Sequence, residues 1–148
     1  MNTGFKNWFL DYTSHAKFIQ LEHSLSNINR KYEYYNIQRD EVPFDSAFNR
    51  YLEYLVGHTE FTYDLYHVHK WKVGSYFDPH IDARDNRKFA YVCELKESKC
   101  KTKLLVNERQ VEESVFSVHT KHEVPEIKLG ERISLTIFGK NIKNKRLL

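Results

Sequence analysis

From residue 61 onward the chain consists of short runs rich in Val, Ile, Thr, Tyr and Phe, separated by polar turns. Such runs are typical of β-strands, because branched and aromatic side chains fit the pleated surface of a sheet. Many short strands joined by polar turns favour a β-sandwich or a barrel. The expected strands cover residues 61–71, 88–95, 103–106, 114–118 and 131–138.

The first sixty residues have a different pattern, which predicts helices. Apolar residues between His15 and Ile28 recur at roughly 3.6-residue spacing, and this favours a first helix. A second helix is expected to begin at Asp45 or Ser46 and to end at Gly57. Its expected buried stripe is Phe48, Tyr51, Leu52 and Leu55.

The length of 148 residues suits a single domain, and no Gly/Ser-rich linker divides it. We expect a helical part over residues 1–60, a barrel core over residues 61–139 and a basic tail over residues 140–148. The net charge of +3 gives no strong case for a nucleic-acid partner. The basic tail is expected to be a solvated terminus, with a contact to nucleic acid or another partner as the alternative.

The two cysteines, Cys93 and Cys100, are too few to form a disulfide framework in a chain of this length. We expect both to be reduced thiols. No apolar run approaches the roughly 18 residues that a membrane-spanning helix requires, and the N-terminus has no apolar signal-peptide core. A cytoplasmic location and no membrane partner are therefore the default expectations, and the sequence leaves the oligomeric state open.

Three residues form a candidate metal site. His80 and Asp82 are two residues apart, so in a strand both side chains would project from the same face. His122 is the candidate third ligand, and His119 competes with it. A His-x-Asp pair alone is a weak signal, but two imidazoles and one carboxylate form the facial triad of non-haem Fe(II) sites.

The last expected strand has two chemically different faces. Arg132, Ser134 and Thr136 share one face, whereas Ile133, Leu135 and Ile137 share the other. An ordinary amphipathic strand with an exposed arginine would show the same pattern. In the functional interpretation the polar face points inward, and Arg132 with Ser134 binds a carboxylate, because the planar guanidinium pairs bidentately with that group.

These motifs together resemble the Fe(II)/2-oxoglutarate-dependent dioxygenase superfamily, and in particular its prolyl-hydroxylase-like branch. The family pattern of an aromatic residue, a glycine and a Phe-x-x-His-x-Asp run is matched from Trp71 to Asp82. The Arg-led strand is matched by residues 87–95, and the strand before the distal histidine by residues 114–124. The closing Gly-x-Arg-x-Ser motif is matched at residues 130–134.

The resemblance implies a double-stranded β-helix, which is a jelly-roll or cupin-like barrel, preceded by helices in a mainly β (α+β) chain. It implies Fe(II) bound by His80, Asp82 and His122, and 2-oxoglutarate bound through Arg132 and Ser134. These residues, apart from Ser134, are the expected catalytic group. In the family reaction O2 is split: one oxygen atom enters succinate as CO2 leaves, and the other enters a substrate C–H bond.

The chain departs from the family pattern at Trp71, where the family usually has a tyrosine whose hydroxyl contacts 2-oxoglutarate. Trp71 keeps the aromatic wall of the co-substrate site but offers only an N–H donor. Tyr91 is a candidate to supply a hydroxyl there, and Tyr76 is another candidate. His69 lies on the predicted strand face of Trp71, as does His67, so His69 is a candidate pocket-lining residue. The family's Gly-Gly pair is also absent from residues 101–105.

The favoured function is an oxygenase that hydroxylates a prolyl or other side chain of a protein or peptide. The same chemistry on nucleic acid or a small metabolite is the first alternative. A non-catalytic metal-binding jelly-roll module is the second, and a cupin-like protein with Zn or Mn is the third, since three ligands alone do not select iron. A carboxylate-binding arginine discriminates, because it is useful only if an oxoacid binds.

Overall fold

The computed structural model describes residues 1–25, 28–57 and 60–141. Within these ranges lie two α-helices, one 3-10 turn and a single antiparallel sheet. The elements are α1 (Thr3–Thr13), β1 (Ile19–Leu25), β2 (Ile28–Gln38), η1 (Arg39–Glu41), α2 (Asp45–Val56), β3 (Phe61–Thr62), β4 (Leu65–Trp71), β5 (Tyr76–His80), β6 (Arg87–Ser98), β7 (Leu104–Val106), β8 (Arg109–Val111), β9 (Glu113–Ser117), β10 (His122–Val124) and β11 (Glu131–Asn141).

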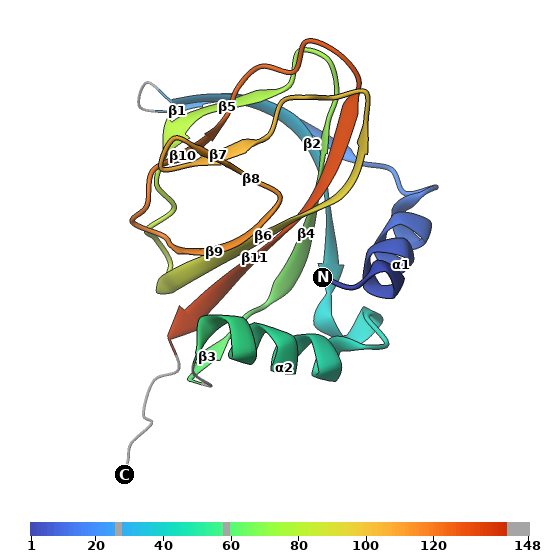
Figure 1. The fold of residues 1–148 in the computed structure, drawn as a ribbon, viewed down its shortest axis with the longest axis vertical. Helices are drawn as coiled ribbons and strands as arrows, with labels where there is room; N and C mark the ends of the chain where they lie inside the picture. Colours follow the sequence, from blue (N-terminus) through green and yellow to red (C-terminus); the bar gives the residue numbers. More distant parts are fainter. Residues whose placement is uncertain (26–27, 58–59, 142–148) are drawn as a thin grey trace.

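The described strands follow the order β8-β7-β10-β5-β2-β4-β11-β6-β9, with β1 beside β2 and β3 beside β11. Figure 1 shows that this sheet curls, so that β5, β7 and β10 lie across from β6 and β9. The result is the mainly β, jelly-roll-like barrel that the sequence predicts. All five predicted strand segments are present, although residues 61–71 form two strands, β3 and β4.

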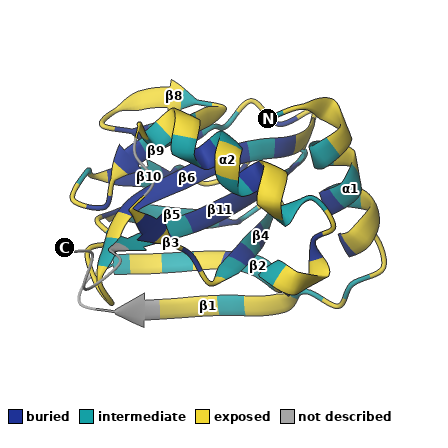
Figure 2. Cartoon of the chain, turned by 90° about the horizontal axis from the view of Figure 1, so that it is seen from below, coloured by how far each residue is buried: buried dark blue, intermediate teal, exposed yellow. Residues whose placement is uncertain are grey.

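Two hydrophobic clusters lie on opposite faces of the central strands. The helices α1 and α2 cover the outer face, where Phe9 and Phe48 pack against Tyr66, Val68 and other buried side chains. The second cluster lies inside the barrel, and it includes Tyr32, Trp71, Phe116 and Val124. Figure 2 shows α2 lying over the buried central strands.

Side-chain alternation along β11 separates these two environments. Leu135 and Ile137 are fully buried in the helix-covered cluster, whereas Arg132, Ser134 and Thr136 point into the barrel. The polar face of this strand therefore points inward, and the binding of a carboxylate by Arg132 and Ser134 stays a prediction. Strand β4 divides in the same way, with Tyr66 and Val68 facing the helices, while His67, His69 and Trp71 face the barrel. Simple alternation along the predicted strand of residues 61–71 would put Tyr63 on the same face as Trp71, but Tyr63 belongs to the helix-covered cluster.

The predicted helix between His15 and Ile28 is wrong. Ile19–Leu25 form β1 and Ile28 begins β2, and the two strands pair in register from Ile19 with Tyr34 to Leu25 with Ile28. Residues 26–27 of the predicted helix lie outside the described residues. The 3.6-residue spacing was coincidental, because inter-strand pairing outweighs the weak local preference of so short a segment. A helix does form earlier, at α1, where the Asn2 side chain accepts a hydrogen bond from the Phe5 N–H.

The predicted second helix is confirmed as α2. Gly57 ends it in the left-handed conformation, with φ of 86°, and its N–H donates to the Glu53 carbonyl. Phe48 and Leu52 are buried as expected, but Leu55 is 37% exposed. Asp45 does not cap the helix, because its carboxylate instead accepts hydrogen bonds from Arg39 and two tyrosines.

Both cysteines are free, as expected, and both are buried. In the described part of the chain no helix is long and apolar enough to span a membrane. Strand β11 extends through Asn141, so the predicted basic tail begins within this strand, where Lys140 contacts Asp64 at 2.7 Å. The rest of that tail, residues 142–148, lies outside the described residues.

Candidate metal centre and its pocket

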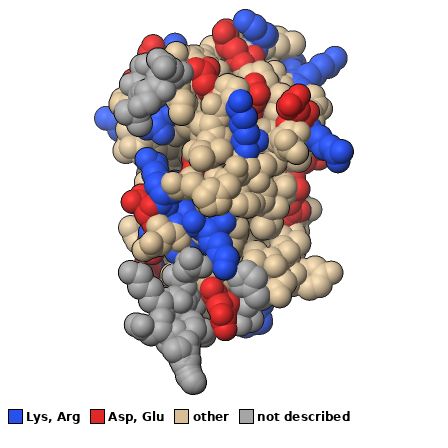
Figure 3. All heavy atoms as spheres, turned by 90° about the vertical axis from the view of Figure 1, so that its left-hand side faces the viewer, with Lys and Arg blue, Asp and Glu red and all other residues tan. Residues whose placement is uncertain are grey.

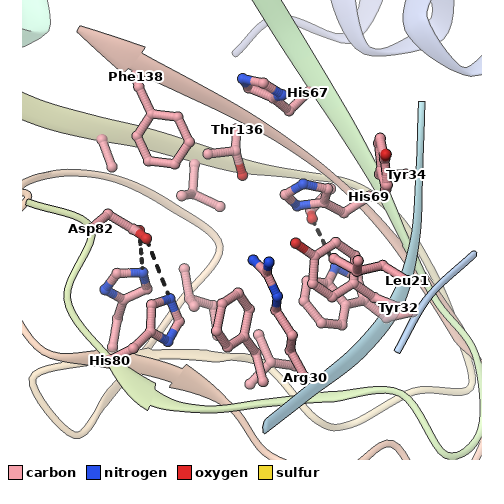
Figure 4. A pocket seen from close by; sticks show the side chains of 18 of the residues that line it. Leu21, Arg30, Tyr32, Tyr34, His67, His69, His80, Asp82, Thr136 and Phe138 are labelled. Carbon is pink, nitrogen blue, oxygen red and sulfur yellow. Dashed lines mark hydrogen bonds and ion pairs between the residues drawn. The ribbon is translucent and has the colours of Figure 1, made fainter. Parts of the chain in front are cut away.

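A cavity of about 280 Å³ lies inside the barrel and contains the predicted site residues of both motifs. Its walls come from strands that are far apart in the sequence, including β2, β4, β6, β10 and β11. The His80–Asp82 segment lines one part of it, and Arg132 with Ser134 lines another. Figure 4 shows the side chains converging on this space from several strands.

The structure brings together His80, Asp82 and His122. His80 ends β5, His122 begins β10, and the two residues are register partners across these strands. Their ring nitrogens and the Asp82 carboxylate lie within 4.8 Å of one another. Asp82 lies just beyond β5, where its N–H donates to the Val118 carbonyl at 3.0 Å, so a loop hydrogen bond positions it. His119 is exposed and is not part of the cluster.

Backbone carbonyls fix the tautomers of both histidines. The Nδ1 atom of His80 lies 2.7 Å from the Asp78 carbonyl oxygen, and that of His122 lies 3.0 Å from the Thr120 carbonyl oxygen. A carbonyl only accepts, so each Nδ1 must carry the hydrogen. Each Nε2 is directed at Asp82, at 2.8 Å for His122 and 3.7 Å for His80 (Figure 4). Orientation of metal-binding histidines by backbone carbonyls is a common feature of metal sites.

The electrostatics of the cluster also suit a metal ion. Burial, followed by the neighbouring His122, lowers the pKa of His80 to about 4. Burial opposes ionisation of Asp82, but the hydrogen bond and charge of His122 outweigh it and lower the pKa of the Asp82 carboxyl. At neutral pH the cluster therefore offers a neutral His80 imidazole and an ionised carboxylate, which are the protonation states that bind metals.

Arg132 is 2% exposed, and its charge is incompletely compensated. Its Nε lies 3.6 Å from Glu94, which also contacts Lys103 at 3.0 Å. Its Nη1 is buried and has no hydrogen-bond partner among the residues that the structure describes. Burial lowers the pKa of Arg132, although Glu94 opposes this. A buried cation with an unpaired N–H donor lowers the stability of the protein unless an anion pairs with it. The Arg132 guanidinium therefore suits a bound carboxylate.

The indole N–H of Trp71 makes a hydrogen bond that the sequence did not predict. Its Nε1–H donates to the Ser134 hydroxyl oxygen at 3.0 Å, and Ser134 is 1% exposed. Because the oxygen accepts from the indole, the hydroxyl hydrogen of Ser134 stays available for a second acceptor. Trp71 therefore orients a donor next to Arg132, whose guanidinium carbon lies 5.4 Å from the indole ring centre.

The structure brings His69 into the pocket but does not bring Tyr91 or Tyr76 there. Tyr91 is buried in the helix-covered cluster, where its hydroxyl donates to Glu113 at 2.6 Å. Tyr76 lines a separate pocket beside β5 and β10. Burial, followed by the charges of His67 and Arg132, lowers the pKa of His69 to about 3, so it is a neutral part of the wall.

Several pocket residues were not predicted. Strand β2 contributes Arg30, Tyr32, Tyr34 and Asn36, and β6 contributes Arg87. The β2 residues recur at every second position, which is the signal of a strand face, but the helical interpretation of the preceding segment obscured it. The Asn36 amide oxygen lies 2.8 Å from Nδ1 of His67.

The described chain thus combines a jelly-roll-like barrel with a His-Asp-His cluster and a buried arginine that line one cavity. Solved structures agree for the fold. A Pseudomonas putida prolyl-4-hydroxylase has a TM-score of 0.71 and 17% identity, covering 96% of this chain and 89% of that chain. A viral collagen prolyl hydroxylase from Paramecium bursaria Chlorella virus-1 has a TM-score of 0.71 and 14% identity, covering 96% and 92%.

A third similar structure is a Trichoplax adhaerens prolyl hydroxylase in complex with a hypoxia inducible factor peptide fragment. Its TM-score is 0.68 and its identity 18%, covering 94% of this chain and 77% of that chain. No family model matches the chain, and no curated protein matches its sequence. The predicted resemblance to 2-oxoglutarate/Fe(II) oxygenases of the prolyl-hydroxylase type is thus confirmed for the fold.

Proposed function

We propose that this protein is an Fe(II)/2-oxoglutarate-dependent oxygenase that hydroxylates a C–H bond in a side chain of a protein or peptide. The observation that carries the proposal is the placement of two complementary features in one cavity. His80, Asp82 and His122 converge with the geometry of a facial triad, and Arg132 offers a buried donor that lacks a partner among the described residues. Neither feature alone would support this chemistry.

The proposed metal ligands are Nε2 of His80, Nε2 of His122 and the carboxylate of Asp82. When bound, the ferrous ion supplies activation of O2, coupled to oxidation of 2-oxoglutarate to succinate and CO2. The protein holds both imidazoles by their Nδ1–H groups, and burial keeps His80 neutral. A set of three protein ligands leaves other positions of an iron ion open for the oxoacid and for oxygen.

The proposed role of Arg132 and Ser134 is to bind the far carboxylate of 2-oxoglutarate. Arg132 offers Nη1, and Ser134 offers the hydroxyl hydrogen that the indole of Trp71 leaves available. This contact would orient the oxoacid across the cavity toward the triad, and the buried side chains of the barrel would exclude bulk water. A metal-binding module without an oxoacid would leave the buried Arg132 donor without a function.

The substrate class is supported by two observations. One fold neighbour was solved with a peptide fragment bound, and the cavity of about 280 Å³ is too small to enclose a large substrate together with an oxoacid. We therefore infer that a side chain of a larger molecule enters the cavity, with a prolyl residue as the first candidate. Small metabolites and nucleic acid are the alternatives that a substrate screen would compare.

The decisive experiment is an anaerobic visible spectrum of the protein with Fe(II), recorded before and after addition of 2-oxoglutarate. Chelation of ferrous iron by the oxoacid is expected to give a weak charge-transfer band at roughly 500 nm, as in open facial triads of this type. The band should fade when oxygen is admitted, with release of succinate. Iron binding without the band would overturn the oxygenase proposal and favour a cupin-like or binding role.

A further inference from the structure

Three arginines besides Arg132 line the same cavity, and the proposed reaction uses none of them. Arg30 comes from β2, Arg84 from the loop after β5, and Arg87 from the start of β6. Nε and Nη1 of Arg87 are buried and, in the described part of the chain, have no hydrogen-bond partner. Figure 4 shows Arg30 directed into the space between His80 and Tyr32.

Aromatic side chains hold two of these guanidinium groups in place. The Arg87 guanidinium carbon lies 3.7 Å from the ring centre of Phe138, and that of Arg30 lies 5.6 Å from the ring centre of Phe77. Stacking of this kind orients a planar guanidinium while leaving its edge donors available. Arg87 is therefore preorganised, with donors that nothing described in the protein satisfies.

The charges around the cavity are unbalanced. Among the described residues that line it, Asp82 is the only Asp or Glu, and the proposed metal site requires this carboxylate. Asp85 lies nearby and contacts Arg84 at 3.9 Å, but both side chains are mostly exposed. Burial, followed by the charge of Arg84, lowers the pKa of Arg87. Figure 3 shows Lys and Arg side chains gathered across the middle of one face of the molecule.

We propose that the substrate is an acidic peptide segment, in which a carboxylate next to the hydroxylated residue binds Arg87, with Arg30 and Arg84 contributing. This inference rests on the proposed oxygenase function and specifies its substrate. Arg87 suits a carboxylate because two N–H groups of its guanidinium can donate to the two carboxylate oxygens at the same time. Arg84 is exposed and can meet further acidic residues where the segment leaves the cavity.

A nucleic acid would supply anionic groups as well, but the two rings that contact Arg87 and Arg30 already stack against other side chains of the protein. Phe138 stacks with Arg87, and Phe77 stacks with the His80 ring at 3.6 Å and with Tyr32 at 5.7 Å. Binding of single-stranded nucleic acid generally depends on bases stacking on such rings. The occupied ring faces therefore favour a peptide.

The test uses fluorescein-labelled peptides that are identical except for the residues flanking a central proline, which are Glu, Gln or Lys. Fluorescence anisotropy measures their binding to the full chain without metal. Succinate release and a 16-Da mass increase, with Fe(II), 2-oxoglutarate and oxygen, measure turnover. The variants are Arg87→Gln, Arg87→Glu and Arg84→Gln, with Lys88→Gln as the control, since Lys88 is exposed, adjacent in sequence and outside the cavity lining.

The wild type and the Lys88→Gln control should bind the Glu peptide about tenfold or more tightly than the Gln peptide, because a hydrogen bond to a charged group is among the stronger ones. Arg87→Gln should remove most of this preference, Arg84→Gln a smaller part, and Arg87→Glu should favour the Lys peptide. Added salt should weaken only the Glu preference. Binding of the Glu and Gln peptides with equal affinity would overturn the inference.

Competition experiments separate the sources of the anion. Stronger competition by an oligothymidine of equal charge would overturn the peptide proposal in favour of nucleic acid. Equal competition by free glutamate at the same concentration would overturn it in favour of a small acid. Failure of the oxygenase proposal has a different signature: the Glu preference would persist in the anisotropy, while no peptide and no 2-oxoglutarate would be turned over.

Discussion

The two faces of the central strands differ in how far their buried polar groups are hydrogen-bonded within the described part of the chain. On the helix-covered face, Asp45 accepts hydrogen bonds from Arg39, Tyr63 and Tyr66 at 2.5–3.0 Å. On the barrel face, three buried polar atoms of Arg87 and Arg132 have no partner among the described residues. Native proteins usually satisfy buried polar groups, so an unsatisfied set signals either strain or a missing ligand.

The same strands form both faces, so a general difference in packing between two parts of the molecule does not explain why one face has unpaired polar atoms. Leu135 of β11 belongs to the complete core, and Ser134, its neighbour, belongs to the incomplete pocket. Polar groups beneath the helices can be saturated because they serve only stability. Groups in a ligand-binding pocket must keep donors and lone pairs available, and this lowers the stability of the protein without its ligand.

The largest effect should follow from breaking the triad. His80→Ala or Asp82→Ala is expected to weaken Fe(II) binding by more than about 100-fold, because even partners outside the ligand set of a metal contribute about 10–100-fold. Isothermal titration under anaerobic conditions measures this affinity. His119→Ala is the matched control, since His119 is exposed and close in sequence to the cluster but not part of it. Retained affinity in both site variants would disprove the ligand assignment.

A smaller effect is expected at Arg132, and it separates function from stability. Arg132→Met keeps an apolar stem but removes the charge, and should weaken 2-oxoglutarate binding by about 30-fold or more, the cost of losing one partner of a buried charge pair. Iron affinity should remain unchanged. The melting temperature should stay the same or rise, because an incompletely paired buried cation costs free energy in the absence of the ligand.

Melting curves and titrations with iron and with 2-oxoglutarate measure the three quantities of this prediction. Arg109→Met, at an exposed position of β8, controls for the change in overall charge. A large drop in melting temperature, with equal loss of iron and oxoacid binding, would mean that Arg132 is structural. In that case the unpaired donor of Arg132 would not indicate a ligand site, and the proposed contrast between the two faces would be wrong.

The motif-bearing residues were predictable because each has a local signature. The alternation of Arg132, Ser134 and Ile133 is visible in the sequence, and the structure places these side chains as that pattern indicates. The spacing of His80 and Asp82 is visible as well, and the two side chains meet, although Asp82 lies in the loop beyond β5 and not in the strand. The metal and co-substrate roles of these residues remain predictions. The spacing of the strands predicted a sandwich or a barrel, and the family resemblance specified the jelly roll.

The sequence predictions were wrong where the local pattern does not show which side of a strand faces the helices and which side faces the barrel. Strand β6 is apolar on both sides, so alternation could not show that Tyr91 faces the helices while Ala90 and Val92 face the barrel. The hairpin of β1 and β2 depends on pairing between strands rather than on local preference, and the arginine contributed by β2 was therefore missed.

The smallest predicted effect tests the saturated face. Asp45→Asn keeps an oxygen acceptor but removes the charge, so it should lower the free energy of unfolding by about 1 kcal/mol at neutral pH, since charge-assisted hydrogen bonds are roughly twice as strong as neutral ones. Burial opposes ionisation of Asp45, but the hydrogen bonds from Arg39, Tyr66 and Tyr63 outweigh it and lower the pKa of its carboxyl.

The sign of the pH dependence follows from that depressed pKa. The carboxylate of Asp45 stabilises the fold fully above the ordinary aspartate pKa of about 3.9, and this contribution is lost as the pH falls through the lower pKa of the folded state. Urea titrations should therefore show a deficit of Asp45→Asn that is full near neutral pH and shrinks in acid. Asp40→Asn, at an exposed position of η1, should show little deficit at any pH. A loss of unfolding free energy that does not change with pH would mean that the shape of the Asp45 side chain, and not its charge, stabilises the helix-covered face.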